Sequence, residues 1–315
     1  MLLHEYQQYN NPIDSRHFNK FRNKHIKQSL LCYNNLCELR AHYPKADCYI
    51  AGSDQIWAQL LSFEDNKSFY LDFGPKDMKR ISYAPSFAMN QYPKNLEEIL
   101  KKELSLFDVI SVREQSGVEI CKQIGFNAKL VLDPTMLLSI TDYEKIIQHP
   151  TTTGPYCFIY AVNVSDPELF DWNNFRDHNT NHNIDSIAVW ANRMDGQMME
   201  TLQGAHYVYP RIEEWLGYIK DAEYCLTSSF HGVVFSIIFH TPFIVVLRPD
   251  SQFAGNDRIM TLLSNLGIEN RILVAGGNNT NILNEKIIWE DIDKKLDKLR
   301  RESISFLSNS ISRKR

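Results

Sequence analysis

The sequence predicts an α/β protein with one parallel β-sheet domain in each half of the chain. Short apolar or aromatic runs are followed by a polar turn and then by a stretch with helical spacing, which is typical of strand–helix units. Such units recur in both halves, and alternating strands and helices favour parallel sheets. The length of 315 residues is about twice that of an average domain, so two domains are expected.

Three strand–turn units are expected in the first half. The run Cys48–Ala51 is a strand that ends in the turn Gly52–Asp54. A second strand is expected over Asp108–Val112, and the helix after it should end at Gly125, which is placed as a C′ residue. The stretch KLVLDPTMLL repeats the pattern, with its turn at Asp133.

The second half continues the alternation. The stretches YCFIYAVNV, IDSIAVWAN and HYVYP are expected strands, and IEEWLGYIKDA is an expected helix. A strand over Tyr224–Thr227 should lead into a helix over about Phe230–Phe239, followed by a strand over Phe243–Leu247. The apolar run Gly232–Leu247 is interrupted by polar residues and is shorter than the roughly 20 residues of a membrane span, so it is interpreted as buried core.

The domain boundary is expected in the polar stretch Ile147–Pro155, which is rich in helix breakers and has no periodicity. The expected domains cover residues 1–148 and 152–284. Residues 285–315 carry apolar residues at near-helical spacing and are expected to form a C-terminal helical tail.

Composition narrows the function classes. The 34 Lys and Arg nearly balance the 38 Asp and Glu, so the charge offers no footprint for nucleic acid. The six cysteines form no CxxC pair and the N-terminus lacks the apolar core of a signal peptide, which indicates a reduced, cytoplasmic protein. The ten histidines lack metal-ligand spacing, so no metal site is expected. Neither GxGxxG nor a Walker A sequence is present, which disfavours a dehydrogenase or a kinase.

Polar residues are expected at three carboxyl ends of strands, where open parallel sheets bind ligands. They are Gly52–Asp54, Arg113 and Ser228–His231. Each also has a purely structural interpretation. Asp54 and either serine could cap a helix, Arg113 could pair with a neighbouring glutamate, and the histidine could be a satisfied core residue.

Arg113 and His231 are both expected at the start of a helix, where the positive end of the helix dipole disfavours a cation unless an anion is present. The free N–H groups of such a turn form an anion site. A cation, an imidazole and a helix terminus together predict a pocket that handles phosphate and can supply a proton. Arg258, after the flexible pair Gly255 and Asn256, is a further candidate.

At these residues the chain resembles the polysaccharide pyruvyl transferase family. Six motifs carry the resemblance over roughly residues 43–272: AGSDQIW, ISYAPSF, VISVREQSG, VLDPTMLL, YPRIEEWLGYIKDAEYCLTSSFHG and PFIVV. The resemblance implies two Rossmann-like domains facing across a cleft, as in the GT-B glycosyltransferase architecture. It also implies transfer of the pyruvyl group of phosphoenolpyruvate onto a sugar of a surface polysaccharide or its precursor, which forms a ketal and releases phosphate.

The opening residues differ from the family pattern. Relatives begin with an apolar strand and a Gly/Asn-rich turn, whereas this chain opens MLLHEYQQYNNPIDSRHFNKF. The resemblance therefore implies that the N-terminal domain, on the acceptor side of the cleft, has its first βα unit missing or replaced.

Carried over by position, the resemblance implies that Arg113 of SVRE and His231 of SFHG contact phosphoenolpyruvate. Asp54 of GSDQIW corresponds to an acidic position near the donor or acceptor. A further basic residue is expected downstream of the histidine motif, and Arg258 is preferred over Arg248. The expected catalytic residues are His231 as acid or phosphate-stabilising group, Asp54 as base, and Arg113. The expected substrate-binding residues are Ser53, Ser228, Ser229, Phe230 and Arg258.

The expected partners follow from this reaction. Phosphoenolpyruvate is the donor substrate, no cofactor or metal is expected, and the acceptor is a sugar that is either free or part of a lipid-linked oligosaccharide. In the lipid-linked case the C-terminal SRKR would contact the inner face of the cell membrane. Two alternatives stay open, namely a sugar-nucleotide-dependent GT-B-like glycosyltransferase and a non-catalytic sugar- or phosphate-binding protein.

Overall fold

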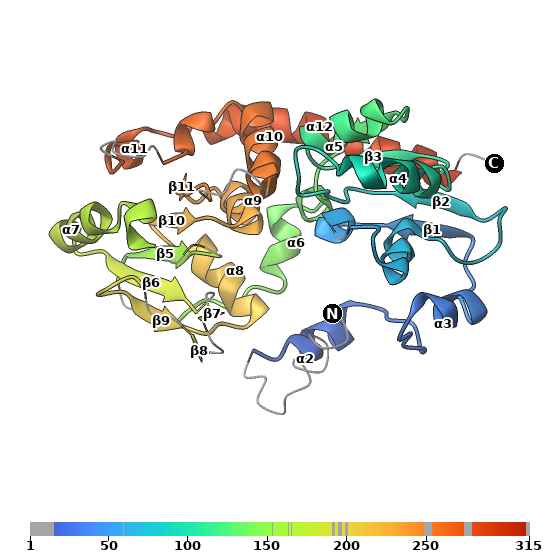
Figure 1. Cartoon of the computed structure of the whole chain (residues 1–315). Coiled ribbons are helices and arrows are strands. Elements are labelled where there is room, and N and C mark those ends of the chain that lie inside the picture. Colours follow the sequence, from blue (N-terminus) through green and yellow to red (C-terminus); the bar gives the residue numbers. More distant parts are fainter. Residues whose placement is uncertain are drawn as a thin grey trace. The chain divides into compact units, whose positions relative to one another are not determined.

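The computed structural model of the chain (Figure 1) describes residues 16–58, 60–152, 154–162, 164, 166–190, 193–194, 197–198, 201–248, 254–273 and 279–312. Contacts between residues divide the chain into two compact units, each built from three segments. Unit 1 consists of Met1–Gln28, Leu138–Pro249 and Ile268–Trp289. Unit 2 consists of Ser29–Leu137, Asp250–Gly267 and Glu290–Arg315.

Unit 1 contains a five-stranded parallel sheet with the strand order β11-β10-β5-β6-β9. The strands are β5 (Tyr156–Tyr160), β6 (Asp185–Val189), β9 (His206–Val208), β10 (Tyr224–Thr227) and β11 (Phe243–Val245). The longer helices are α7 (Trp172–His182), α8 (Ile212–Lys220) and α9 (Phe230–Phe239), and the shorter ones are α2 (Phe18–His25), α6 (Ile140–Glu144) and α11 (Asn281–Asn284). A separate antiparallel pair is formed by β7 (Arg193–Met194) and β8 (Gln197–Met198).

Helices cover both faces of this sheet because successive side chains of a strand point to opposite faces. In β5, the ring of Phe158 stacks on Tyr218 of α8 with the ring centroids 5.3 Å apart. Its neighbours Cys157 and Ile159 belong instead to a buried cluster that includes Phe175 of α7. Unit 1 is therefore a Rossmann-like, doubly wound layer.

Unit 2 contains two parallel strand pairs that a single parallel bridge, Ile81–Val109, connects. The strands are β1 (Cys48–Ala51), β2 (Lys79–Ser82), β3 (Ile110–Val112) and β4 (Ala128–Leu130). The helices are α3 (Leu36–Ala41), α4 (Glu97–Leu104), α5 (Gln115–Gln123), α10 (Asp257–Leu266) and α12 (Trp289–Ser312). The core of this unit is rich in aromatic side chains, of which Trp57, Tyr70 and Phe87 are fully buried.

The division into units differs from the boundaries expected at residues 148 and 285. The segment that carries α10 is inserted in the second half of the chain but belongs to unit 2. Nearly all of α12 also belongs to unit 2 and is not a separate tail, because its Phe306 and Leu307 pack against Tyr83 and Val131. Spacing along the sequence reveals an apolar face, but it does not reveal which core that face joins.

Several predicted elements are confirmed. The strands Cys48–Ala51 and Tyr224–Thr227 and the helix Phe230–Phe239 have the expected ends. Gly125, at a φ of 91°, follows the last turn of α5 as expected for a C′ glycine. The fold class, α/β with parallel sheets, is likewise confirmed.

Other elements are shorter than predicted. The strands expected over Asp108–Val112 and Phe243–Leu247 are present as β3 and β11, with three residues each. The helix expected after Asp54 is only the 3₁₀ turn η1 (Gln55–Ala58). The chain instead turns inward at Trp57, whose indole stacks on the ring of Tyr70 at a centroid distance of 5.2 Å, so tertiary packing overrides the local helical pattern.

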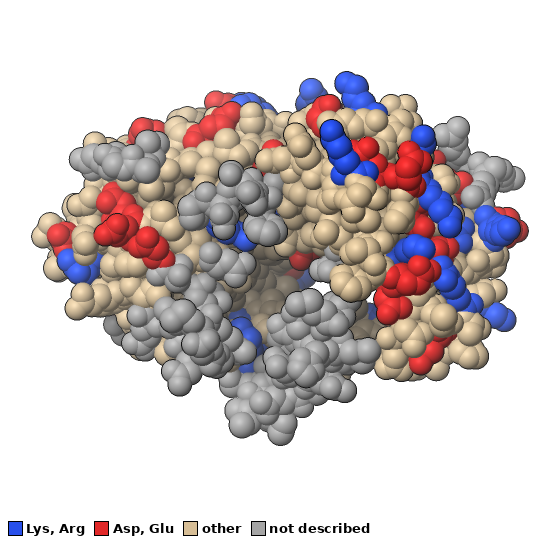
Figure 2. All heavy atoms as spheres, viewed as in Figure 1, with Lys and Arg blue, Asp and Glu red and all other residues tan. Residues whose placement is uncertain are grey.

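The expected loss or replacement of a first βα unit concerns the opening residues, and those up to position 15 lie outside the described residues. Within the described part of the chain, no helix has both the length and the apolar character to cross a membrane. Figure 2 shows basic and acidic side chains intermixed on the face in view. Surface ion pairs such as those of Arg40 with Glu64 and Asp72 are consistent with this mixing.

Candidate functional site

The loop after β1 presents Asp54 at the edge of unit 2. Gly52 has a φ of 144°, and a Cβ there would lie 1.9 Å from the carbonyl oxygen of Tyr83, so only glycine fits. The following Ser53 is half-buried. Asp54 has a φ of 64°, in the left-handed region that Asp and Asn tolerate best among residues with a side chain. Its carboxylate is 62% exposed.

Arg113 directly follows β3 and its side chain is completely buried. One terminal nitrogen, Nη1, donates to Oδ2 of Asp133 at 2.8 Å. The other, Nη2, donates to Oδ1 of Asp54 at 2.6 Å. The guanidinium thus joins the loops that follow β1 and β4 to the end of β3. The alternative, purely structural interpretation paired Arg113 with a neighbouring glutamate. Glu114 is in fact more distant than the two aspartates, since Nε of Arg113 lies 4.0 Å from its carboxylate.

Asp133 is a further residue of this group of charges, which the sequence interpretation placed at a strand end without assigning it a role. Its side chain is 1% exposed. Its second oxygen, Oδ1, accepts hydrogen bonds from the backbone N–H of Thr135 at 3.0 Å and from its hydroxyl at 2.7 Å. The sequence signal for Asp133 was its place in VLDP after a predicted strand. Its partner Arg113 lies 20 residues away in the sequence, so the pairing itself had no local signal.

Glu114 is fully buried beside Arg113, and burial raises the pKa of its carboxyl group while the guanidinium acts in the opposite direction. One carboxyl oxygen accepts a hydrogen bond from the backbone N–H of Phe87 at 2.8 Å. Glu114 therefore links the loop after β2 to the end of β3. Like Asp133, it was not among the predicted site residues.

Arg258 brings a second guanidinium to Asp54, with its Nη1 3.6 Å from the same oxygen, Oδ1. In the amide orientation that satisfies its neighbours, the oxygen of Gln55 accepts from both terminal nitrogens of Arg258 at 3.3 and 3.2 Å. Arg248, the alternative candidate, belongs to unit 1 and is half-buried, which lowers its pKa. The preference for Arg258 over Arg248 remains a prediction, and the contact of Arg258 with Asp54 supports it.

Arg258 reaches this position because α10 packs on the start of α5. The carboxylate of Asp257 accepts from the N–H of Ser116 at 3.0 Å, and the hydroxyl of Thr261 accepts from the N–H of Gln115 at 3.1 Å. The anion expected near the helix start beside Arg113 is thus supplied by the protein itself. We call Asp54, Arg113, Asp133 and Arg258 the arginine–aspartate cluster.

In unit 1 the expected serines complete the turn between β10 and α9. The hydroxyl of Ser228 accepts from the N–H of Val162 at 2.8 Å and donates to its carbonyl oxygen at 3.0 Å. The hydroxyl of Ser229 accepts from the N–H of Gly232 at 3.4 Å and caps α9. Both hydroxyls therefore make the structural bonds of the alternative interpretation.

His231 lies in the first turn of α9 and is half-buried. The buried ring of Phe230 lies nearly perpendicular to the imidazole, with ring centroids 5.4 Å apart. A Cβ at Gly232 would lie 2.3 Å from the hydroxyl oxygen of Thr227, so a glycine lets α9 start tightly against β10. The imidazole is placed where the strand of a parallel sheet ends, the usual position of ligand-binding groups.

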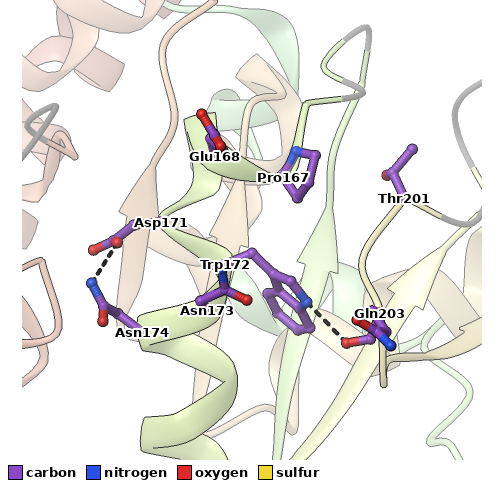
Figure 3. Close-up of a pocket in the computed structure, with 8 residues that line it drawn as sticks. All are labelled: Pro167, Glu168, Asp171, Trp172, Asn173, Asn174, Thr201 and Gln203. Atoms are coloured by element: carbon purple, nitrogen blue, oxygen red, sulfur yellow. Dashed lines mark hydrogen bonds between the residues drawn. The ribbon is translucent and has the colours of Figure 1, made fainter.

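A separate pocket of about 390 Å³ lies in unit 1 at the start of α7 (Figure 3). The indole N–H of Trp172 donates to the carbonyl oxygen of Gln203 at 3.0 Å, and Asp171 accepts from the amide of Asn174 at 2.6 Å. Its lining residues include two acids but no Lys or Arg: Pro167, Glu168, Asp171, Trp172, Asn173, Asn174, Thr201 and Gln203. The pocket contains none of the predicted site residues, and its charge disfavours an anionic ligand.

Within the described residues, no three His, Cys, Asp or Glu side chains are grouped as metal ligands. The polar groups at strand ends are instead a pair of guanidiniums with carboxylates in unit 2 and an imidazole in unit 1. Chemically, the guanidinium pair can exchange a carboxylate for an anionic ligand. The imidazole can donate a proton or stabilise negative charge.

Comparison with solved structures shows the fold. The chain resembles a protein described as a UDP-N-acetylglucosamine 2-epimerase from Listeria monocytogenes, with a TM-score of 0.51 and 11% sequence identity over 90% of this chain and 81% of that one. It also resembles a trehalose-6-phosphate synthase, with a TM-score of 0.46 and 10% identity over 79% of this chain and 75% of that one. At 11% identity the likeness to the first of these structures extends to the α/β architecture alone.

Sequence comparison identifies the family. None of the curated protein sequences compared with the chain matches it. The sequence pattern of the family described as polysaccharide pyruvyl transferase matches residues 3–251, which include all four members of the SSFH turn, Asp54 and Arg113. This match spans most of the chain and confirms the resemblance, so the chain belongs to the polysaccharide pyruvyl transferase family.

Proposed function

We propose that this protein transfers the pyruvyl group of phosphoenolpyruvate onto a sugar and forms a pyruvate ketal on two of its hydroxyl groups. Family membership supports the transferase class. The observation that carries the donor assignment is the arginine–aspartate cluster, in which two guanidiniums from distant parts of the sequence meet at one carboxylate oxygen. Guanidinium pairs of this kind suit the carboxylate or phosphate of phosphoenolpyruvate.

The proposed reaction balances without a cofactor. Both sugar oxygens form bonds to the central carbon of phosphoenolpyruvate, and the bond from that carbon to the phosphate oxygen breaks. The two sugar hydroxyl groups lose two protons in total. One proton is gained at the methylene carbon, which becomes a methyl group, and one proton leaves with the phosphate. The step therefore needs a proton donor, a proton acceptor and cations that stabilise the departing phosphate.

The residues of the chain can fill these roles. His231 is the proposed acid or phosphate-stabilising group, because an imidazole at a helix start is suited to both tasks. Arg113 and Arg258 hold the anionic donor, and Asp54 accepts a proton from a sugar hydroxyl. Asp54 also lies beside both guanidiniums. A carboxylate paired with two cations is a weak proton acceptor. Asp54 must therefore leave the two guanidiniums before it can accept a proton from the sugar hydroxyl.

The acceptor is proposed to be a sugar of a surface polysaccharide or its precursor, free or carried on a lipid-linked oligosaccharide. The reaction is proposed to take place in the cytoplasm, where phosphoenolpyruvate is available. The resulting ketal would leave a carboxylate on the sugar.

The test incubates the purified protein with phosphoenolpyruvate and a panel of hexose acceptors. We expect acceptor-dependent release of phosphate together with a product whose mass exceeds that of the acceptor by one pyruvic acid less one water, and the added group should be acid-labile. The sugar-nucleotide alternative predicts the opposite ligand preference. In that case a nucleoside diphosphate, and not phosphoenolpyruvate, would raise the melting temperature of the protein.

A further inference from the structure

Both guanidiniums of the arginine–aspartate cluster already have carboxylates beside them. Arg113 bonds to Asp54 and Asp133 and lies 4.0 Å from Glu114, and Arg258 lies 3.6 Å from Asp54. An anionic ligand that bound both guanidiniums would bring further negative charge beside these carboxylates. Its binding would therefore favour displacement of one of the two carboxylates that bond to Arg113, those of Asp54 and Asp133.

The two carboxylates differ in how firmly they are held. Asp133 is 1% exposed, and its two oxygens together accept hydrogen bonds from Arg113 and from Thr135. Breaking such a buried pair leaves an uncompensated buried charge and is strongly unfavourable. Asp54 is 62% exposed, so water can hydrate its carboxylate when it leaves, and Arg113 keeps Asp133 as a counter-charge. Asp54 is thus the carboxylate that a ligand can displace.

The position that Asp54 would vacate is already shaped for an anion. Nη2 of Arg113 and Nη1 of Arg258 both face its single oxygen Oδ1, at 2.6 and 3.6 Å. A ligand oxygen placed there would receive donors from two separate guanidiniums. Asp133 would keep Arg113 in the same orientation throughout, so Asp133 is a positioning residue for the donor site.

We propose that Asp54 is an internal competitor of the anionic donor: it occupies Arg113 and Arg258 in the free protein, and the donor displaces it. This inference rests on the proposed function, because the displaced Asp54 is the group that accepts the hydroxyl proton. While paired with two guanidiniums the carboxylate is a weak proton acceptor. Donor binding takes over both cations and leaves Asp54 able to act, so the base becomes competent only when the donor is present.

The test substitutes Asp54→Asn and measures the dissociation constant of phosphoenolpyruvate by calorimetry. Asn tolerates the left-handed backbone at this position, and it removes the charge of the competitor. The expected result is binding that is tighter by about fivefold or more, since the ion pairs of Asp54 with the two guanidiniums no longer have to be broken. Turnover should fall at least about 100-fold because the base is lost. A merely damaged site would weaken binding and turnover together.

Two further variants sharpen the test. Asp54→Gly also accepts a positive φ and removes the side chain altogether, so it should tighten binding at least as much. Asp72→Asn is the matched control, because Asp72 is another exposed aspartate of unit 2 that pairs with an arginine, Arg40. It removes the same charge without touching the cluster and should leave both the affinity and turnover unchanged.

Inorganic phosphate serves as a second probe that does not depend on the proposed reaction. If wild-type protein fails to bind phosphoenolpyruvate but Asp54→Asn binds phosphate more tightly than wild type, the donor assignment fails and the competition stands. If Asp54→Asn binds both anions equally well or more weakly than wild type, the competition is wrong. Tightening by Asp72→Asn of the same size would also overturn it, since the effect would then reflect net charge alone.

Discussion

The arginine–aspartate cluster of unit 2 and the turn that carries His231 in unit 1 both place polar groups at the end of a parallel strand, but these groups bond to different kinds of partner. Each follows a parallel strand, and each needs a glycine where no side chain fits, Gly52 in one and Gly232 in the other. In unit 2 the polar groups are satisfied by side chains of opposite charge. In unit 1 they are satisfied by hydroxyl groups and the backbone. Under the proposed competition a ligand exchanges places with a carboxylate in the cluster, whereas the two serines of the turn bond to the backbone.

Within unit 2 a second buried arginine shows that burial alone does not mark a site. Arg80 donates hydrogen bonds to the backbone carbonyl oxygens of Leu71, Phe73, Pro75 and Met78. These bonds tie the loop before β2 together. Arg113 is equally buried but is bound by two carboxylates, one of which is open to solvent. The two arginines are thus equally deep, and the exposed carboxylate beside Arg113 is what makes it the candidate for ligand binding.

The largest effect is expected from removing the guanidinium at the centre of the cluster. Arg113→Met leaves Asp133 buried without its counter-charge, which should lower the free energy of unfolding by about 3–5 kcal/mol in urea denaturation. The double variant with Asp133→Asn should recover a large part of this loss, because the stranded charge is gone. A loss below about 1 kcal/mol would show that the ion pair does not support unit 2.

The next largest effect is expected from removing the imidazole of His231 in unit 1, and it should appear in the turnover number but not in stability. His231→Ala should lower the turnover number at least about 100-fold, the lower bound for one positioned acid or base. The melting temperature should change little, since the side chain is only half-buried. Near-normal turnover by a folded His231→Ala protein would remove this histidine from the mechanism.

A smaller effect separates the serines from the histidine beside them. Ser228→Ala removes both bonds to Val162 and should lower the free energy of unfolding by about 1–3 kcal/mol. Ser229→Ala removes the cap of α9 and should cost about 1 kcal/mol. Turnover per folded molecule should stay within a few-fold of wild type. A loss of 10-fold or more in that measure would instead support the predicted contact of these serines with substrate.

The smallest effect is a pH dependence outside both regions. Glu103 is buried, its two carboxyl oxygens have no hydrogen-bond partner within the part of the chain that the structure describes, and burial raises its pKa above the ordinary 4.5. The folded protein therefore holds this proton more tightly than the unfolded chain. The corresponding stability is fully present below about pH 4.5 and is lost as pH rises through the raised pKa. Glu103→Gln should stabilise the protein more at pH 7 than at pH 4, as measured by denaturation at both values. An equal effect at both pH values would show that the carboxyl group titrates normally.

The sequence alone was sufficient for elements whose signals are local. The strand Tyr224–Thr227, the serine cap after it and the helix Phe230–Phe239 were predictable because apolar runs, capping residues and turn residues act on their immediate neighbours. The motifs were also sufficient for the family and for Asp54, Arg113 and His231 as candidates. What each residue contacts was not predictable in this way.

The tertiary structure alone decided which charges meet. Asp133 is 20 residues from Arg113, and Asp54 is 59 residues from it. Arg258 reaches Asp54 only because α10, inserted in the second half of the chain, packs on α5. The physical reason is that hydrogen-bond capping and side-chain periodicity act over a few residues, whereas Coulombic pairing depends on distance in space. That distance is set by how sheets and helices pack, and no local pattern in the sequence encodes it.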